Sequence, residues 1–393
     1  MLSSFERGVI ILVNNALKSE NSPLPEDFDY SRLYGFAKDQ QISTLIFYGG
    51  KNDPEFLAKD EKRRLYALAM YLAASNQDQM RELERLCRAF EENGIDFMRL
   101  KGSVVKWLYP SSDMRIMGDA DVLIRREQMD EIENLMLGLG YSYLVTSDHE
   151  WIWHRGGLDV ELHKRMIPSY TKDLYAYFGD GWALAEPKAQ GSHEHVLRAE
   201  EELIYLVAHF TKHYRYAGIG IKHLVDIYVF LEAHKELDLE YVNAKLEKLG
   251  IASFYRNIRK TLEAWFGGAE MDECAEFITH KVFSGGAYGT DKDRSRYEAA
   301  AFALGTTAKR AKRKKFLRVV FPSYKNMSGE YPWLKRCPVL LPFAWIYRII
   351  HVLLFRRDHV KRERENIAAI NKTEIEAYKS ELKLVGLDFN FEV

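Results

Sequence analysis

Two aspartates separated by one residue are the most chemically suggestive feature of the sequence. Asp119 and Asp121 lead into the apolar residues Val122-Leu123-Ile124, which is the pattern of a strand entering a core. In a strand, residues two apart project from the same face, about 6 to 7 Å apart along the chain. Carboxylates held in this way repel one another, and a divalent cation with oxygen ligands relieves that repulsion. The pair therefore predicts a cation site.

A Gly-Ser turn lies a short distance upstream of the two aspartates. Gly102-Ser103 follows an apolar run at 95–100 and precedes another at 104–108, so the spacing predicts a strand, a turn and a helix. Backbone N–H groups in a turn of this kind bind phosphate. A phosphate cradle beside a cation site is thus expected.

A third acidic side chain comes from a later segment. Gly156-Gly157 separates two strand-like runs and predicts a hairpin. On its second arm, Asp159, Glu161 and His163 alternate with apolar residues, so all three share one face. We expect His163 to orient Glu161 or to pack in the sheet.

Several of these residues recur in the order of a known family. The relevant positions are Leu100-Lys101-Gly102, Tyr109-Pro110, Arg115, Asp119-x-Asp121 and Val160-Glu161-Leu162-His163. From about residue 44 to residue 233, the chain resembles the bacterial uncharacterised nucleotidyltransferases of the polymerase-beta-like superfamily. The resemblance implies an α+β fold, in which a small mixed sheet with flanking helices is embedded between N-terminal and C-terminal helical regions.

The resemblance also implies an activity and the residues that perform it. A nucleoside triphosphate would transfer its monophosphate to a hydroxyl acceptor and release pyrophosphate, with Mg²⁺ as cofactor and Mn²⁺ as an alternative. Asp119, Asp121 and Glu161 would be the catalytic residues and metal ligands, with Glu161 on the side of the attacking hydroxyl. Gly102 and Ser103 would hold the β- and γ-phosphates through backbone N–H groups and the hydroxyl.

Four further residues are expected to bind the nucleotide. Lys101 stands beside the turn, Arg115 precedes Asp119 by four residues, and Lys222 and Asp226 are one helical turn apart. Arg115 suits bidentate contacts with phosphate. An ordinary surface ion pair at Arg115, and an i,i+4 ion pair between Lys222 and Asp226, remain open alternatives.

Histidines and lysines accompany Lys222 on the two predicted helices. His209, Lys212 and His213 share one helix, and His223 follows on the next. The expectation is that they face the nucleotide. A zinc site of the three histidines is the weaker alternative, because the His-Glu-x-x-His pattern is missing.

The hydrophobic periodicity divides the 393 residues into four regions. We predict an N-terminal helical region at 1–93, a catalytic domain at 94–190, a helical domain packing on the cleft at 191–275, and a mostly helical region at 276–393. A long helix at 61–93 is the strongest single element, and the chain is expected to be helical again after Pro187.

Composition restricts the class of protein and its partners. The 56 basic and 57 acidic residues nearly cancel to a net charge of -1. The net charge of the chain therefore does not attract polyanions such as nucleic acid. Cys87, Cys274 and Cys337 form no Cys-x-x-Cys pair, which argues against disulfides or structural zinc and favours a cytoplasmic location. No signal peptide is recognisable at the N-terminus.

The C-terminal region leaves a question about membranes. Residues 338–355 are apolar, but two prolines, Arg348 and His351 interrupt them, so no transmembrane span is expected. Seven basic residues between Lys309 and Arg318 predict a solvated helix face, with RNA or a membrane surface as alternatives. Peripheral contact with an anionic bilayer stays open.

Two function classes follow. The first is the nucleotidyltransferase described above, acting on a small molecule, sugar, protein or RNA acceptor. The alternative is a catalytically silent nucleotide-binding or scaffold protein, peripheral to the membrane in surface-polysaccharide assembly. The three carboxylates favour the enzyme.

Overall fold

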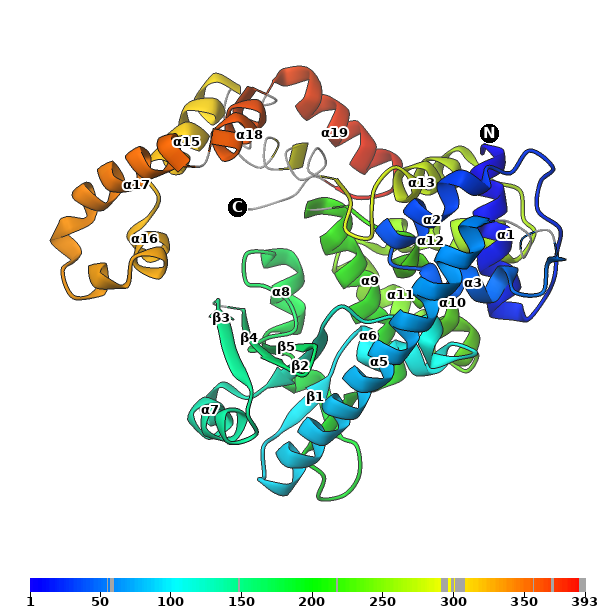
Figure 1. Ribbon diagram of the computed structural model, residues 1–393, viewed down its shortest axis with the longest axis horizontal. Helices are drawn as coiled ribbons and strands as arrows, with labels where there is room; N and C mark the ends of the chain where they lie inside the picture. Colours follow the sequence, from blue (N-terminus) through cyan, green and yellow to red (C-terminus); the bar gives the residue numbers. More distant parts are fainter. Residues whose placement is uncertain are drawn as a thin grey trace.

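A seven-stranded sheet with helices packed around it forms the body of the protein in the computed structural model, and further helices extend from the body as an arm (Figure 1). The structure describes residues 1–54, 56, 60–147, 149–216, 218–290, 296–297, 300, 308–355, 357–368 and 371–388.

Four helices of the described N-terminal residues precede the sheet: α1 (Ser4–Lys18), α2 (Tyr30–Asp39), α3 (Ser43–Gly50) and α5 (Asp60–Glu92). Ser3 and Glu6 form a capping box that satisfies backbone N–H groups at the start of α1. The long helix predicted at 61–93 is confirmed as α5. Its apolar stripe packs against the sheet through Leu83, Leu86 and Phe90.

The sheet is mixed, which confirms the predicted α+β fold class. Its strands are β1 (Phe97–Arg99), β2 (Ala120–Ile124), β3 (Ser142–Thr146), β4 (Glu150–Arg155), β5 (Leu158–His163), β6 (Ala185–Pro187) and β7 (Glu194–Leu197). Their order is β3-β4-β5-β2-β1-β7-β6. β2 runs parallel to β5, and β1 runs parallel to β7, whereas the other pairs are antiparallel.

The connections between the strands largely follow the sequence pattern. They contain α6 (Gly102–Val105), η1 (Lys106–Leu108), η2 (Ser112–Met114), η3 (Arg126–Gln128), α7 (Met129–Gly138), α8 (Lys172–Phe178) and η4 (Trp182–Leu184). Gly156 and Gly157 both have positive φ and form the predicted hairpin turn between β4 and β5. The expectation of helix directly after Pro187 is wrong, because β7 first adds a strand beside β1.

Between the sheet and residue 290, the described chain forms α9 (Ala199–Tyr216), α10 (Ile221–Ala233), α11 (Leu239–Lys248), α12 (Ala252–Phe266) and α13 (Glu273–Phe283). Their apolar faces share one core cluster with the N-terminal helices α1 to α3. A second cluster, which includes Trp151 and Trp153, fills the space between the sheet, α5 and α7. The four-region division of the chain remains a prediction.

The arm comprises α15 (Ala308–Val320), α16 (Tyr324–Glu330), η5 (Pro332–Lys335), η6 (Pro338–Leu340), α17 (Leu341–Phe355) and α18 (Arg357–Ala368). A last helix, α19 (Lys372–Leu384), returns to the body, where Tyr378 and Leu382 join the main core cluster. Across the described part of the chain, no helix has the length and apolar character needed to cross a membrane.

Candidate active site

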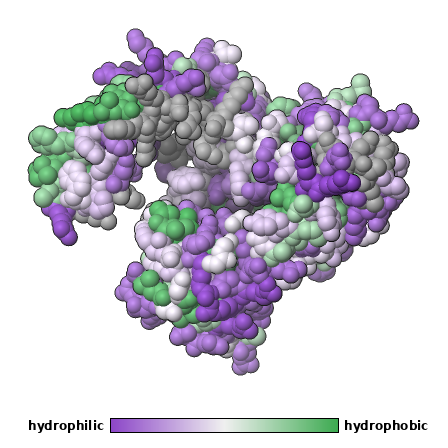
Figure 2. All heavy atoms as spheres, viewed as in Figure 1, coloured by the Kyte–Doolittle hydropathy of each residue, from purple (hydrophilic) through white to green (hydrophobic). Residues whose placement is uncertain are grey.

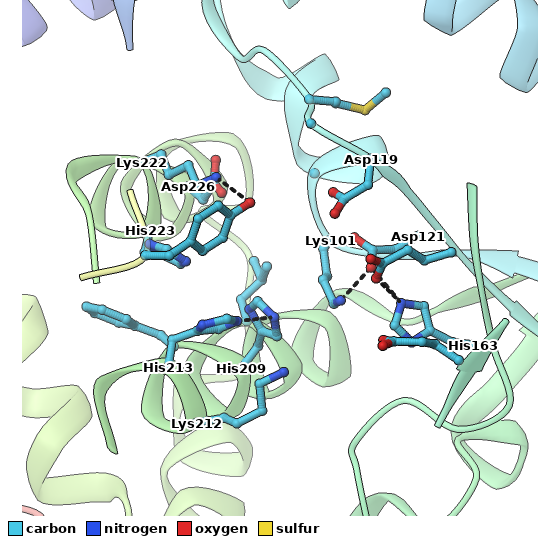
Figure 3. A pocket seen from close by; sticks show the side chains of 18 of the residues that line it. Lys101, Asp119, Asp121, His163, His209, Lys212, His213, Lys222, His223 and Asp226 are labelled. Atoms are coloured by element: carbon cyan, nitrogen blue, oxygen red, sulfur yellow. Dashed lines mark hydrogen bonds and ion pairs between the residues drawn. The ribbon is translucent and has the colours of Figure 1, made fainter. Parts of the chain in front are cut away.

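A polar pocket of about 390 Å³ lies between the β2/β5 part of the sheet and helices α9 and α10. The sheet side contributes Lys101, Asp119, Asp121, Glu161 and His163, and the helices contribute histidines and lysines. The two groups face one another across the pocket (Figure 3). The pocket therefore joins residues that the sequence analysis placed in two separate regions.

The carboxylates converge as predicted. Asp121 and Glu161 are direct partners in the parallel pairing of β2 with β5, so their side chains project from the same face of the sheet. Asp119, one residue before β2, also lines the pocket. Oxygens of Asp121 and Glu161 and a ring nitrogen of His163 lie within 4.8 Å of one another.

The close approach of these carboxylates perturbs their protonation. Burial, together with the negative charges of Asp121 and Asp119, raises the pKa of Glu161 to about 8. Burial and the charge of Asp121 also raise the pKa of Asp119. Such shifts show that charge is concentrated here and are frequent at functional sites.

Asp121 is held in its ionised form by two neighbours. Lys101 Nζ donates to Asp121 Oδ1 at 2.6 Å, and His163 Nε2 lies 2.6 Å from the same oxygen. Although burial opposes the charge, these contacts hold the pKa of Asp121 well below its usual range. His163 is farther from Glu161, at 3.5 Å, so the residue that it orients is Asp121 and not Glu161 as expected.

Lys101 has an unusual backbone conformation. Its φ of 51° and ψ of -121° are unfavourable for a residue with a side chain. This conformation begins the turn into α6 and accompanies the direct ion pair between Lys101 and Asp121. The lysine predicted to hold phosphate thus contacts a carboxylate in this structure.

The Gly-Ser turn contributes Gly102 to the pocket, whereas Ser103 lies inside the fold. The Ser103 side chain is buried, and its hydroxyl donates to the Leu100 carbonyl at 2.7 Å. The first turn of α6 directs it away from the pocket, so the predicted contact between this hydroxyl and phosphate does not match the structure. Gly102 packs against Arg115, whose Nη2 would be 3.3 Å from a Cβ at that position.

Arg115 lines the pocket and joins the segment before β2 to α10. Its Nε and Nη2 donate to the two carboxylate oxygens of Asp226 at 2.7 and 2.8 Å, and its Nη1 donates to the Ile116 carbonyl. Tyr109 donates its hydroxyl proton to the same carboxylate. The pair is mostly buried, so the alternative of a surface ion pair for Arg115 is wrong. Asp226 therefore positions Arg115.

Lys222 is also placed at the pocket, with partners other than Asp226. Its Nζ donates to Gln41 at 2.8 Å and to the Tyr288 hydroxyl at 3.0 Å. Burial, with Arg115 close by, lowers the pKa of Lys222 to about 7. An incoming anion would raise this pKa, so Lys222 would gain positive charge when a phosphate binds.

Several pocket residues were missed by the sequence analysis, among them His149, Glu150 and Tyr288. His149 and Glu150 come from the β3–β4 connection and the start of β4, and Tyr288 comes from the loop after α13. The glycines at 285, 286 and 289 indicated a loop at Tyr288. Nothing in the local pattern showed that this loop reaches Lys222.

The residues present fit a hard divalent cation. Asp119, Asp121 and Glu161 supply oxygen donors of the kind that Mg²⁺ prefers. Both contacts to Asp121 use Oδ1, which leaves Oδ2 as the oxygen available to a cation.

Comparison with known proteins shows the family to which the chain belongs. No curated protein and no solved structure is detectably similar to the chain. Residues 26–267 match the family described as uncharacterised nucleotidyltransferase, a span that includes the sheet, α9, α10 and nearly all the residues of the pocket. The chain therefore belongs to the uncharacterised nucleotidyltransferase family.

Proposed function

We propose that the protein transfers a nucleoside monophosphate from a nucleoside triphosphate to a hydroxyl acceptor, with Mg²⁺ as cofactor and Mn²⁺ as an alternative. The acceptor oxygen forms a bond to the α-phosphorus, the bond to the β-phosphate oxygen breaks, and pyrophosphate and the acceptor proton leave. The observation that carries the proposal is the convergence of Asp119, Asp121 and Glu161 in one pocket. The same arrangement supports placement in the polymerase-beta-like superfamily.

The residues of the chain have separable roles in this reaction. Asp119, Asp121 and Glu161 would hold the cation, which when bound neutralises charge on the attacking and leaving oxygens. His163 keeps Asp121 oriented and ionised through its 2.6 Å contact. Glu161, whose pKa is raised to about 8, would hold the cation as a carboxylate and would accept the proton of the attacking hydroxyl.

The triphosphate would be held by three basic residues of the pocket. Arg115, Lys212 and Lys222 line the pocket, and burial lowers the pKa of both lysines. Phosphate oxygens would replace the lost hydration of these lysines and restore their charge. Asp226 fixes the direction of the Arg115 guanidinium.

The test uses Glu161→Gln and Asp159→Asn as a matched pair on the same strand. The protein is incubated with each α-labelled nucleoside triphosphate, Mg²⁺ and a cell extract, and the labelled product is identified and quantified. We expect Glu161→Gln to lower the rate about a hundredfold or more, since a metal ligand contributes several kcal/mol to the transition state. Asp159, whose side chain is half exposed and pairs with His154, should be dispensable. Equal rates for Glu161→Gln and the wild type would refute the proposal.

A nucleotide-binding protein without turnover is the second candidate. The Lys101 ammonium group already contacts Asp121, which gives this carboxylate a positive partner within the chain. In that case, labelled nucleotide would bind in equilibrium dialysis while no component of the extract became labelled.

A further inference from the structure

Three histidines gather on the helical wall of the pocket, opposite the carboxylates. His209 and His213 are one turn apart on α9, and His223 lies in the first turn of α10. One ring nitrogen from each lies within 4.8 Å of the other two. All three line the pocket (Figure 3), so a ligand entering the pocket can reach them.

The spacing of the rings is close to that of metal ligands. His209 Nε2 and His213 Nε2 are 3.0 Å apart. Two nitrogens bound at 2.0–2.1 Å to a tetrahedral zinc ion are separated by about 3.3–3.4 Å. A shift of a few tenths of an ångström therefore converts this contact into a pair of metal ligands.

The Nδ1 atoms of His223 and His213 show how the two rings are held. His223 Nδ1 lies 3.3 Å from both the N–H and the carbonyl of Gly220. In the tautomer that donates Nδ1–H to the carbonyl, Nε2 carries the lone pair that a metal binds. His213 Nδ1 is buried and has no hydrogen-bond partner among the described residues. Because Nε2 is the atom in the cluster, a water molecule and not the cation would satisfy this nitrogen.

The protonation of the cluster is compatible with metal binding. Burial, together with neighbouring positive groups, lowers the pKa of His223 to about 3 and the pKa of His209 and His213 well below the usual value. The imidazoles are therefore neutral at pH 7, and the neutral ring is the form that binds metal.

We propose that His209, His213 and His223 form a binding site for a borderline divalent cation of the zinc class, separate from the carboxylates of the sheet. Imidazole nitrogens suit Zn²⁺, Co²⁺ and Ni²⁺ better than Mg²⁺. Three protein ligands leave a fourth position, open to the pocket, for water or an oxygen of a bound molecule. The missing His-Glu-x-x-His pattern argued against zinc, but here the third ligand comes from a different helix.

The test measures metal binding directly and needs no activity assay. The full chain is stripped with a chelator, dialysed and titrated with Co²⁺ while its visible absorption is followed. A second stripped sample is loaded with Zn²⁺, and the bound Zn²⁺ is quantified by elemental analysis. We expect one equivalent with the visible spectrum of a four-coordinate site. His213→Ala and His209→Ala should weaken binding by about tenfold or more, since loss of even an outer partner has such an effect.

Two comparisons make the outcome decisive. His234→Ala, outside the pocket at the end of α10, and Glu161→Gln should both retain the cation. Retained binding in His213→Ala with loss in His163→Ala would place the cation at the sheet and overturn the proposal, as would no binding to the wild type. Shifted imidazole N–H resonances in the Co²⁺-loaded wild type would report histidine coordination even if a variant failed to fold.

The arm carries an independent second feature, a row of exposed apolar side chains on α17. The row follows helical spacing and comprises Phe343, Ile346, Tyr347, Ile350, Leu353 and Leu354. Apolar surface gathers over the arm in the space-filling view (Figure 2). A row of this size on a soluble surface indicates a binding face.

The charge on the neighbouring helix indicates what binds there. α15 lies in the same arm and packs with α17 and α18 around an apolar groove. Lys309, Arg310, Arg313, Lys314 and Arg318 on α15 are exposed. A second copy of the chain would bring an identical basic helix and be repelled, whereas an anionic bilayer is attracted to it.

We propose that the arm binds an anionic lipid surface through the apolar row of α17 and the basic residues of α15. An amphipathic helix with basic neighbours lies in the interface plane and does not span it. This proposal does not rest on the proposed activity.

Vesicle sedimentation of the full chain tests the lipid proposal. We expect binding to vesicles containing phosphatidylglycerol, little binding to phosphatidylcholine alone, and release by salt, which screens the charges. Ile346→Glu with Ile350→Glu should abolish sedimentation, whereas Leu137→Glu, an exposed leucine on α7, should not. A wild type that stays in solution with anionic vesicles, or an arm that instead mediates a dimer dissociated by the double substitution, would overturn it.

Discussion

At the scale of single residues, several charged side chains of the pocket form direct ion pairs with one another. Lys101 and His163 pair with Asp121, and Arg115 pairs with Asp226. Asp119 and Glu161 have raised pKa values, and the ion-pair contact that Glu161 makes with His163 is longer, at 3.5 Å. These two groups therefore have the most to gain from a bound cation.

The sequence was sufficient to predict which residues belong to the site, but not the direction in which every side chain points. Alternation along a strand was sufficient to place Asp121 and Glu161 on one face. The inward rotation of Ser103 and the pairing of Arg115 with Asp226 depend on how α6 and α10 pack. Two residues 111 positions apart leave no local signal of their contact.

Glu202, on α9 outside the pocket, gives a prediction about pH. Burial raises its pKa from 4.5 to about 8, and its Oε1 has no hydrogen-bond partner in the described chain. The folded protein keeps this proton while the unfolded chain loses it above its lower pKa. The resulting stability is full below about pH 4.5 and declines by about 1.4 kcal/mol per pH unit until about pH 8.

Glu202→Gln removes this ionisation and should therefore stabilise the protein increasingly across that window. Urea unfolding at about pH 5 and about pH 8 measures the difference, with Glu240→Gln at an exposed position of α11 as the control. A stability gain that is the same at both pH values would contradict the burial argument.

At the scale of elements, long periodic segments were predictable and short ones were not. The helix α5 and the β4–β5 hairpin carry enough periodic residues to be identified. Strands β6 and β7 have three and four residues, and β7 forms because Phe97 pairs with Glu194 from far along the chain. Tertiary pairing decided the structure there.

A close contact between two glycines positions the loop that carries Tyr288. Gly218 has a φ of +108°, and a Cβ there would lie 2.4 Å from the Gly289 Cα. Gly218→Ala should therefore lower the free energy of unfolding through backbone strain of about 1–2 kcal/mol and through the clash as well. Displacement of Tyr288 from Lys222 should also weaken nucleotide binding.

Gly157→Ala is the matched control for Gly218→Ala. Gly157 has a φ of +82° with no atom within 4 Å of the added Cβ, so it carries the strain without the clash. Urea unfolding and nucleotide titration of both variants separate the two effects. Equal losses of stability would show that the Gly218–Gly289 contact is unimportant.

At the scale of the whole molecule, the pocket lies where two hydrophobic cores meet. One core joins the N-terminal helices to α9–α13, and the other lies beneath the sheet. A bound nucleotide would contact residues from both sides. Binding should accordingly stabilise the molecule as one unit.

Nucleotide and Mg²⁺ together should raise the melting temperature. A ligand at a hundredfold excess over its Kd adds about 2.7 kcal/mol to the free energy of unfolding. Differential scanning fluorimetry with each triphosphate, with and without Mg²⁺, measures the shift, and Asp119→Asn should lose the Mg²⁺-dependent part. The absence of a shift at saturating nucleotide for the wild type would argue against a nucleotide site.

The return of α19 to the body has a consequence for the integrity of the chain. Tyr378 donates its hydroxyl proton to the carbonyl of Arg215 near the end of α9, and Lys281 pairs with Glu381. These contacts fasten the C-terminal end of the arm to the body. A protease that cut within the arm would yield two fragments that stay together under native conditions and separate only in denaturant.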